Sequence, residues 1–351
     1  MTAKRTFLRD RVAAVSNRSG TVTNGEQLVV LDRARRWIKV RSPRGEVGWL
    51  DEKTVATEDT ADAFAQLAEE HAHDPAVGHA TVRDEVVLHI APGRDKEYFY
   101  RLAEGDKLEM LERATIQKPV PPGSSLYATQ ASSADVSIPA TPPPPVMEDW
   151  WLVRQPNGHT GWIYGRMIDV DAPDTIERYS EGQRIVGAYL LTHVNDPDSG
   201  IMKDGKTDPD VPEYVTVINS WKAGLPYDFN QVRVFTWNLK KHRYETAMRD
   251  RNIEGYLPLT VGMEKNPYGK TPLDATPLPS FSYKVLAADA PQPVPDPKTG
   301  LLTPSKTITK TYRLLGSITE RVLPPGTQPP VEAHAVPEET KDKKKSARKH
   351  R

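Results

Sequence analysis

The chain has 351 residues, of which 32 are proline and none is cysteine. Lys and Arg together number 47, as do Asp and Glu, so no net field attracts nucleic acid or an anionic membrane, and no nucleic-acid partner is expected. The missing cysteine excludes disulfides, thiolate metal sites and a cysteine nucleophile. The length suits domains of roughly 100 to 200 residues, and the clustered prolines favour β modules separated by proline-rich connectors.

The sequence contains no apolar run that approaches the roughly 18 residues of a membrane-spanning helix. Residues 1–15 also lack the apolar core of a signal peptide. We therefore expect no membrane span in this chain. A chain that begins in this way would also suit removal of an export signal or of a lipid-anchored cysteine.

Two segments of the chain repeat. Residues 24–34 match residues 104–114 without a gap at an offset of 80, and residues 40–50 match residues 153–163 at an offset of 113. Because the offset grows by 33, the second copy should contain an insertion of that length, at about 115–147. The insertion holds eight prolines, so we expect an exposed, flexible loop with polyproline character.

Each copy shows the features of short antiparallel strands. In the first copy, Leu28 and Val30 share one face of an expected strand, and Trp37 begins the next. A turn at 43–45 then leads to Gly48, where a missing side chain lets two backbones approach closely. The second copy repeats these events at Trp150, at the turn 156–158 and at Gly161.

This order of features resembles the bacterial SH3 (SH3b) family. The resemblance implies two small SH3-like β-barrels, at residues 8–55 and 82–170. Residues 88–93 look like the opening "LNVRSGPS" stretch of the family, which the first copy lacks. We match residues 8–10 of the first copy with residues 82–84 of the second as opening strands.

The rest of the chain is assigned by pattern. Residues 56–78 should form a helical linker, with Thr57 or Thr60 as its N-cap and Phe64 on its apolar face. Residues 179–322 hold several runs of β-branched and aromatic residues, which predict an antiparallel β domain, either a sandwich or blade-like. Residues 323–351 end in a basic stretch and should form a disordered tail. The fold class is therefore mainly β.

The sequence contains no motif that predicts catalysis. It has no G-x-S-x-G elbow, and the cluster His71, His73 and Asp74 lacks the HExxH spacing of zinc hydrolases. A polar helix end is the better interpretation of that cluster. We expect no catalytic residue, no metal and no cofactor.

Exposed aromatic residues are the candidates for ligand binding. Trp150 and Trp151 are adjacent in an expected strand, so they should point to opposite faces, and one ring should be at least partly exposed. Trp37, Tyr98 and Tyr100 are further candidates for a surface groove. Since only the second copy has the paired tryptophans, we expect it to be the binding copy.

The function implied by the resemblance is non-enzymatic. We expect a binding or scaffold protein of the bacterial cell envelope or periplasm, whose SH3b-like modules recognise peptidoglycan peptide or an envelope protein. One alternative is an accessory or targeting part of a cell-wall enzyme, with activity in residues 179–322. Another is a purely structural subunit of a complex. The sequence leaves the oligomeric state open.

Overall fold

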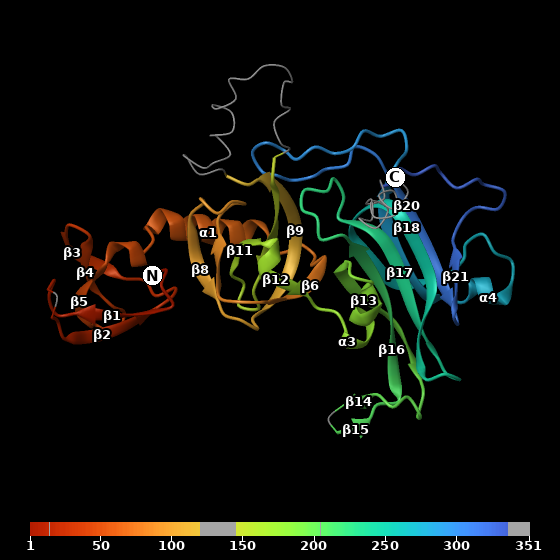
Figure 1. Cartoon of the computed structure of the whole chain (residues 1–351), viewed down its shortest axis with the longest axis horizontal. Coiled ribbons are helices and arrows are strands. Elements are labelled where there is room, and N and C mark those ends of the chain that lie inside the picture. Colours follow the sequence, from red (N-terminus) through yellow and green to blue (C-terminus); the bar gives the residue numbers. More distant parts are fainter. Residues whose placement is uncertain (14, 120–144, 204, 336–351) are drawn as a thin grey trace, which may run out of the picture. The chain divides into compact units, whose positions relative to one another are not determined.

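The computed structural model describes residues 1–13, 15–119, 145–203 and 205–335. These residues form antiparallel sheets with a few short helices, which confirms the predicted mainly β class (Figure 1). The chain divides into one unit of Met1–Asp169 with Pro295–Leu302, and another of Val170–Val294 with Thr303–Arg351. Among the described residues, no helix is long and apolar enough to cross a membrane. The proline-rich residues 120–144 and the basic residues 340–351 lie outside the described residues.

The first sheet has five antiparallel strands in the order β2-β1-β5-β4-β3. Alternation along β4 buries Ile38 and Val40, which pack with Leu8 and Leu50 to form a small core. A short 3-10 helix, η1 (Glu52–Thr54), follows the last strand. The strands are β1 (Arg5–Arg9), β2 (Arg18–Thr23), β3 (Val29–Ala34), β4 (Trp37–Arg41) and β5 (Val47–Asp51).

Gly48 lets strands β1 and β5 of the first sheet approach closely. A Cβ atom at this position would lie 2.7 Å from Leu8 Cβ and 2.9 Å from the Arg9 carbonyl oxygen. Both contacts are closer than packed carbon and oxygen atoms allow, so only glycine fits. The same approach recurs at Gly161, where an added Cβ would lie 2.8 Å from Leu88 Cβ.

The second sheet has seven strands in the order β12-β6-β9-β10-β11-β7-β8. Helix α1 (Glu58–Glu70) begins at Thr57, whose side chain accepts the Thr60 N–H at 3.2 Å, and its buried Phe64 packs beside Gly161 of this sheet. The expected insertion begins later and ends earlier than predicted, because Gln117 pairs with Met147. The strands are β6 (Gly78–Val82), β7 (Val86–His89), β8 (Tyr98–Leu102), β9 (Lys107–Gln117), β10 (Met147–Arg154), β11 (Thr160–Tyr164) and β12 (Ile168–Val170).

Strand pairing in the two sheets has the same register. Thr6 pairs with Val22 in the first sheet, and Val86 pairs with Leu102 in the second. Each residue of the second pair is numbered 80 higher than its counterpart in the first pair. Across the closing strands, Arg9 lies opposite Trp49 and His89 lies opposite Trp162, which are offsets of 80 and 113.

The shared register corrects the expected opening strands. Leu8 corresponds to Leu88, not to Val82, and strand β1 stands where β7 stands in the second sheet. The predicted match of residues 8–10 with residues 82–84 is therefore wrong, and residues 8–10 align with residues 88–90. The expected match rested on the similarity of residues 8–10 to residues 82–84, which is three residues long. The backbone pairing instead keeps the offset of 80 that relates residues 24–34 to residues 104–114.

The third sheet is a seven-stranded antiparallel meander, in the order β13-β16-β17-β18-β19-β20-β21. The predicted antiparallel β domain is confirmed, with one continuous sheet in place of the two packed sheets of a sandwich. The strands are β13 (Arg184–Asn195), β16 (Asp210–Asn219), β17 (Phe229–Asn238), β18 (Arg243–Glu264), β19 (Leu278–Leu286), β20 (Thr307–Leu315) and β21 (Ile318–Arg321), with a small hairpin of β14 (Met202–Lys203) and β15 (Lys206–Thr207). The short helices nearby are η2 (Gly165–Met167), α3 (Asp174–Glu177), η3 (Arg178–Ser180) and α4 (Pro272–Ala275).

Part of the expected tail belongs to the second unit. Glu332 and His334 form bridges to Ala287 and Ile253, and Ala335 is buried. Disorder from residue 323 onward is therefore wrong for residues 332–335, because backbone pairing with the third sheet holds them.

Replacing Gly48 with alanine tests the close approach of the strands. We expect Gly48→Ala to lower the free energy of unfolding by about 1–3 kcal/mol, since the added methyl group forces β1 and β5 apart. Urea unfolding followed by circular dichroism measures the loss. Gly262→Ala is the control, because its added Cβ would meet only Ser280 Oγ, at 4.0 Å. An equal effect of the two substitutions would contradict the role of the close approach.

Candidate functional site

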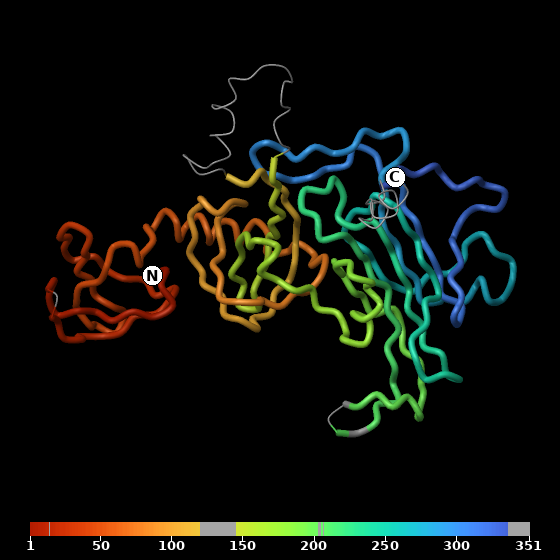
Figure 2. Tube along the Cα trace, viewed as in Figure 1, coloured from red at the N-terminus to blue at the C-terminus, as the bar shows by residue number. Residues whose placement is uncertain are grey.

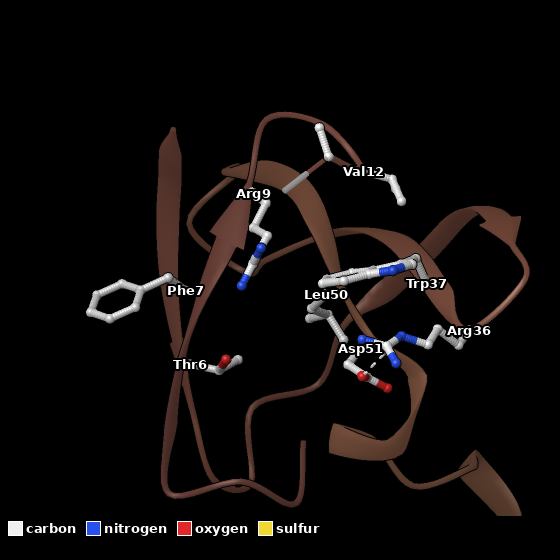
Figure 3. A pocket seen from close by; sticks show the side chains of 9 residues that line it. Thr6, Phe7, Arg9, Val12, Arg36, Trp37, Leu50 and Asp51 are labelled. Atoms are coloured by element: carbon white, nitrogen blue, oxygen red, sulfur yellow. Dashed lines mark ion pairs between the residues drawn. The ribbon is translucent and has the colours of Figure 1, made fainter. Parts of the chain in front are cut away.

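An open pocket of about 560 Å³ lies on the first sheet. We call it the Trp37 groove. It lies between the end of β1 and the strands β4 and β5, and Figure 3 shows Arg9 between the Phe7 side chain and the Trp37 ring. Its lining residues are Thr6, Phe7, Arg9, Val12, Ala13, Arg36, Trp37, Leu50 and Asp51.

Trp37 is the aromatic centre of this groove. It is the first residue of β4 and follows a tight turn in which Arg35 has a φ of 57°. The turn leaves the ring partly exposed at the end of the hairpin. The guanidinium carbon of Arg9 lies 5.1 Å from the ring centre and that of Arg36 lies 5.6 Å away, distances at which a cation interacts favourably with the ring.

The two arginines differ in their partners. Arg36 forms an ion pair with Asp51 at 3.7 Å, whereas no carboxylate within the described ranges pairs with Arg9. Residues 1–56 contain twelve Lys and Arg against six Asp and Glu, a net charge of +6 in a chain that is neutral as a whole. The groove therefore offers an uncompensated cation beside an aromatic face, which suits an anionic ligand with some apolar surface.

The corresponding place in the second sheet is closed. His89 stands at the position of Arg9 and Trp150 at that of Trp37, and their rings meet edge to face with centres 5.2 Å apart. Tyr164 stands at the position of Asp51, 5.8 Å from the ring centre of Trp150. Leu301 packs against the same apolar cluster. Aromatic and aliphatic side chains thus occupy the space that is open in the first sheet.

Leu301 belongs to a segment that is distant in the sequence and that pairs with strand β9. The Thr115 N–H donates to the Gly300 carbonyl oxygen at 2.8 Å, and Ala114 and Leu301 form an antiparallel bridge. Gly300 has a φ of 74°, and a Cβ there would lie 2.8 Å from Ile116 Cγ2, so the segment lies tightly against β9 (Figure 2). The segment Pro295–Leu302 therefore completes the core of the second sheet.

The structure does not bring the five predicted ligand residues together. Trp37 lines the groove, but Trp150 and Trp151 are only 1% and 2% exposed, so the expectation of one exposed ring in this pair is wrong. Strand β10 lies between β9 and β11, with both faces covered. Tyr98 is exposed, and Tyr100 stacks on the His159 ring with centres 3.7 Å apart.

The sequence reasoning missed Arg9, Phe7 and Asp51. Arg9 lies on β1 and Asp51 on β5, which pairs with both β1 and β4, and only this strand pairing shows that the two residues are neighbours of Trp37. Extending the offset of 80 towards the N-terminus would have aligned Arg9 with His89 and marked that position.

The histidine cluster after helix α1 forms a local contact. His71 Nδ1 lies 2.6 Å from Asp74 Oδ2. In the part of the chain that the structure describes, no group of three histidine or acidic residues could hold a metal ion. The favoured interpretation, a polar helix end, agrees with this contact.

Comparison with known proteins supports the SH3b resemblance of the first sheet. Residues 5–56 match the family model "Bacterial SH3 domain", so the resemblance is confirmed for that part of the chain. A solved structure, the crystal structure of an NlpC/P60 family protein from Bacillus cereus ATCC 10987 at 1.79 Å resolution, aligns with 67% of this chain and 82% of its own at 12% identity. Its TM-score is 0.18, and at that value the match supports no conclusion. No curated protein matches the chain.

The closed site in the second sheet should make stability depend on pH. Burial lowers the pKa of His89 below its ordinary value of 6.5, against the opposing effect of its hydrogen bond with the Lys96 carbonyl oxygen. Below pH 6.5 the unfolded chain binds a proton that the folded chain does not, so the free energy of unfolding should fall as the pH drops. Urea unfolding between pH 8 and pH 5 should show a smaller fall for His89→Gln. Identical pH profiles for the two proteins would refute this account.

Proposed function

We propose that this protein is a non-enzymatic binding protein of the bacterial cell envelope, and that the Trp37 groove binds a carboxylate-bearing peptide of the peptidoglycan. The observation that carries the proposal is Arg9, a cation without a carboxylate partner among the described residues, held over the Trp37 ring in an open groove. A bacterial SH3 domain, matched at residues 5–56, fits a cell-wall-associated binding module.

The charge of the groove supports a carboxylate ligand. Arg9 can donate to both oxygens of a carboxylate, and a planar guanidinium presents its donors in the matching geometry. The net charge of +6 over residues 1–56 would also speed the encounter with an anionic polymer. Asp51 pairs with Arg36, so it neutralises that cation and leaves Arg9 as the anchor.

The aromatic and aliphatic lining supports a peptide with apolar stems. Phe7 and Val12 line the groove and are 36% and 44% exposed, so their surfaces can cover methyl and methylene groups of a bound peptide. A free inorganic anion would use Arg9 alone. The combination favours a short peptide that carries both features.

We also propose that the second sheet is a diverged SH3b-like module with a support role. Its support is the shared register of the strand pairs and the repeated glycine contact at Gly161. Because Trp150 and its neighbours fill the corresponding site, this module would keep its fold without binding at that place. This assignment moves the expected binding site from the second copy to the first.

Sedimentation with purified peptidoglycan sacculi tests the groove. The full chain should bind, and Arg9→Ala and Trp37→Ala should each weaken binding about tenfold or more, because each removes half of the cation and ring pair. Added NaCl should weaken wild-type binding, as expected for an exposed charge.

Arg41→Ala is the matched control for this experiment. Arg41 is an exposed arginine on the same strand as Trp37, about 13 Å away along the strand at about 3.3 Å per residue. Its loss should leave binding nearly unchanged. An equal loss for Arg41→Ala would show attraction to charge alone, and no sedimentation of the wild-type chain would reject the wall ligand.

A further inference from the structure

Strand β3 is an edge of the first sheet with an unusual surface. It has β4 as its one neighbour among the described strands, and all of its residues except Ala34 are exposed. Val29, Val30 and Leu31 are 58%, 45% and 40% exposed. Edge strands are usually shielded by charges, prolines or covering segments, because an open apolar edge invites pairing with another chain. Three consecutive apolar residues on this edge therefore need an explanation.

The same positions are buried in the second sheet. Val30 and Leu31 correspond to Met110 and Leu111 of β9 at the offset of 80, and both of those side chains lie in the core. The pairing to the next strand is also shared, since Val30 lies opposite Val40 and Met110 opposite Val153. The strand register shifts at the next residue in both cases, which is Leu31 in β3 and Leu111 in β9.

Strand β6 covers the edge of β9. It pairs antiparallel with β9, with Gly78 opposite Met110 and Ala80 opposite Leu108. The Val77 N–H donates to the Met110 carbonyl oxygen at 2.8 Å. Leu67 of helix α1 and Leu301 pack on the cluster that contains Leu111. In the second module, strand β6 therefore pairs with the edge of β9, and side chains from helix α1 and residue 301 cover the apolar residues of that strand.

The edge of β3 has the geometry to accept the same kind of strand. Because β3 and β9 share their register to the neighbouring strand, the backbone groups that Met110 directs towards β6 have their counterparts in Val30. In the first sheet these groups face the open edge. Added pairing there would satisfy them and would cover Val30 and Leu31 at the same time.

We propose that β3 is a docking site for an extended segment of a partner protein, which adds to the first sheet as an antiparallel strand. Small or apolar residues at alternate positions would lie opposite Leu28 and Val30, as Ala80 and Gly78 lie opposite Leu108 and Met110. Arg35 and Arg41 are exposed at the end of the hairpin and beside β3, so an acidic residue at one end of the segment complements the edge.

The size of the edge favours a short segment over a second copy of the chain. A six-residue strand pairing alone covers far less than the roughly 1,000 Å² that a stable dimer needs. A peptide strand that gains its affinity from backbone pairing needs no larger surface. The site is separate from the Trp37 groove, whose lining contains no residue of β3.

A peptide copied from the covering strand provides the probe. A fluorescein-labelled peptide with the sequence of residues 76–84, extended by two glutamates, should bind the full chain with a measurable change in fluorescence anisotropy. Val30→Pro removes an edge N–H, and the double variant Val29→Lys with Leu31→Lys places charges on the edge; each should weaken binding about tenfold or more. Hydrogen exchange should slow in residues 28–32 when the peptide is bound.

Two matched variants test whether the peptide binds at β3 and nowhere else on the first sheet. Val47→Lys changes another exposed valine of the same sheet and should retain binding, and Arg9→Ala should also retain it, even where binding to sacculi is lost. Circular dichroism checks that each variant is folded. The proposal is overturned by the absence of saturable binding up to about 1 mM peptide. It is also overturned by equal binding of wild type and both edge variants, or by a wild-type dimer that the lysine variant dissociates.

Discussion

The contact between a glycine of the closing strand and a leucine of the first strand determines the geometry of both small sheets. Gly48 faces Leu8, and Gly161 faces Leu88, at distances that leave no room for a side chain. This contact brings the end of β1 across β5, and it therefore sets Arg9 beside Trp37. The groove is a consequence of how the sheet closes, because its lining comes from strands that meet only there.

The same strand arrangement supports an open site in the first sheet and a closed site in the second. The residue at the position of Arg9 and His89 suits the site in each sheet. The guanidinium of Arg9 suits a groove that is open to solvent, since burying an unpaired guanidinium would cost several kcal/mol. His89 can lose its charge, and burial lowers its pKa accordingly. A neutral ring can then pack against Trp150 and tolerate the covering leucine. Side-chain chemistry and enclosure have thus changed together.

Local patterns predicted the strands and the linker helix, but not the long-range covering of the second sheet. The glycine and tryptophan spacing identified both repeated segments, and the fold class followed from them. The burial of Trp150 could not be predicted, because Leu301 reaches its cluster from 151 positions further along the chain. The groove was missed for a related reason, since Arg9 and Trp37 become neighbours only through strand pairing. Likewise, residues 332–335 look like a polar tail until their pairing with the third sheet is known.

The segment Pro295–Leu302 has a consequence for the order in which the protein can fold. During synthesis at roughly 5–20 residues per second, Leu301 leaves the ribosome at least about 8 to 30 s after Trp150. For that interval the cluster around Trp150 lacks one wall, although its strands have already been made. The first module needs no such late contribution, because the residues of its core cluster all lie within the first 55 positions. Folding of the second module is therefore coupled to completion of much of the C-terminal region, and a nascent chain that stalls before residue 301 would expose an apolar surface to chaperones and proteases.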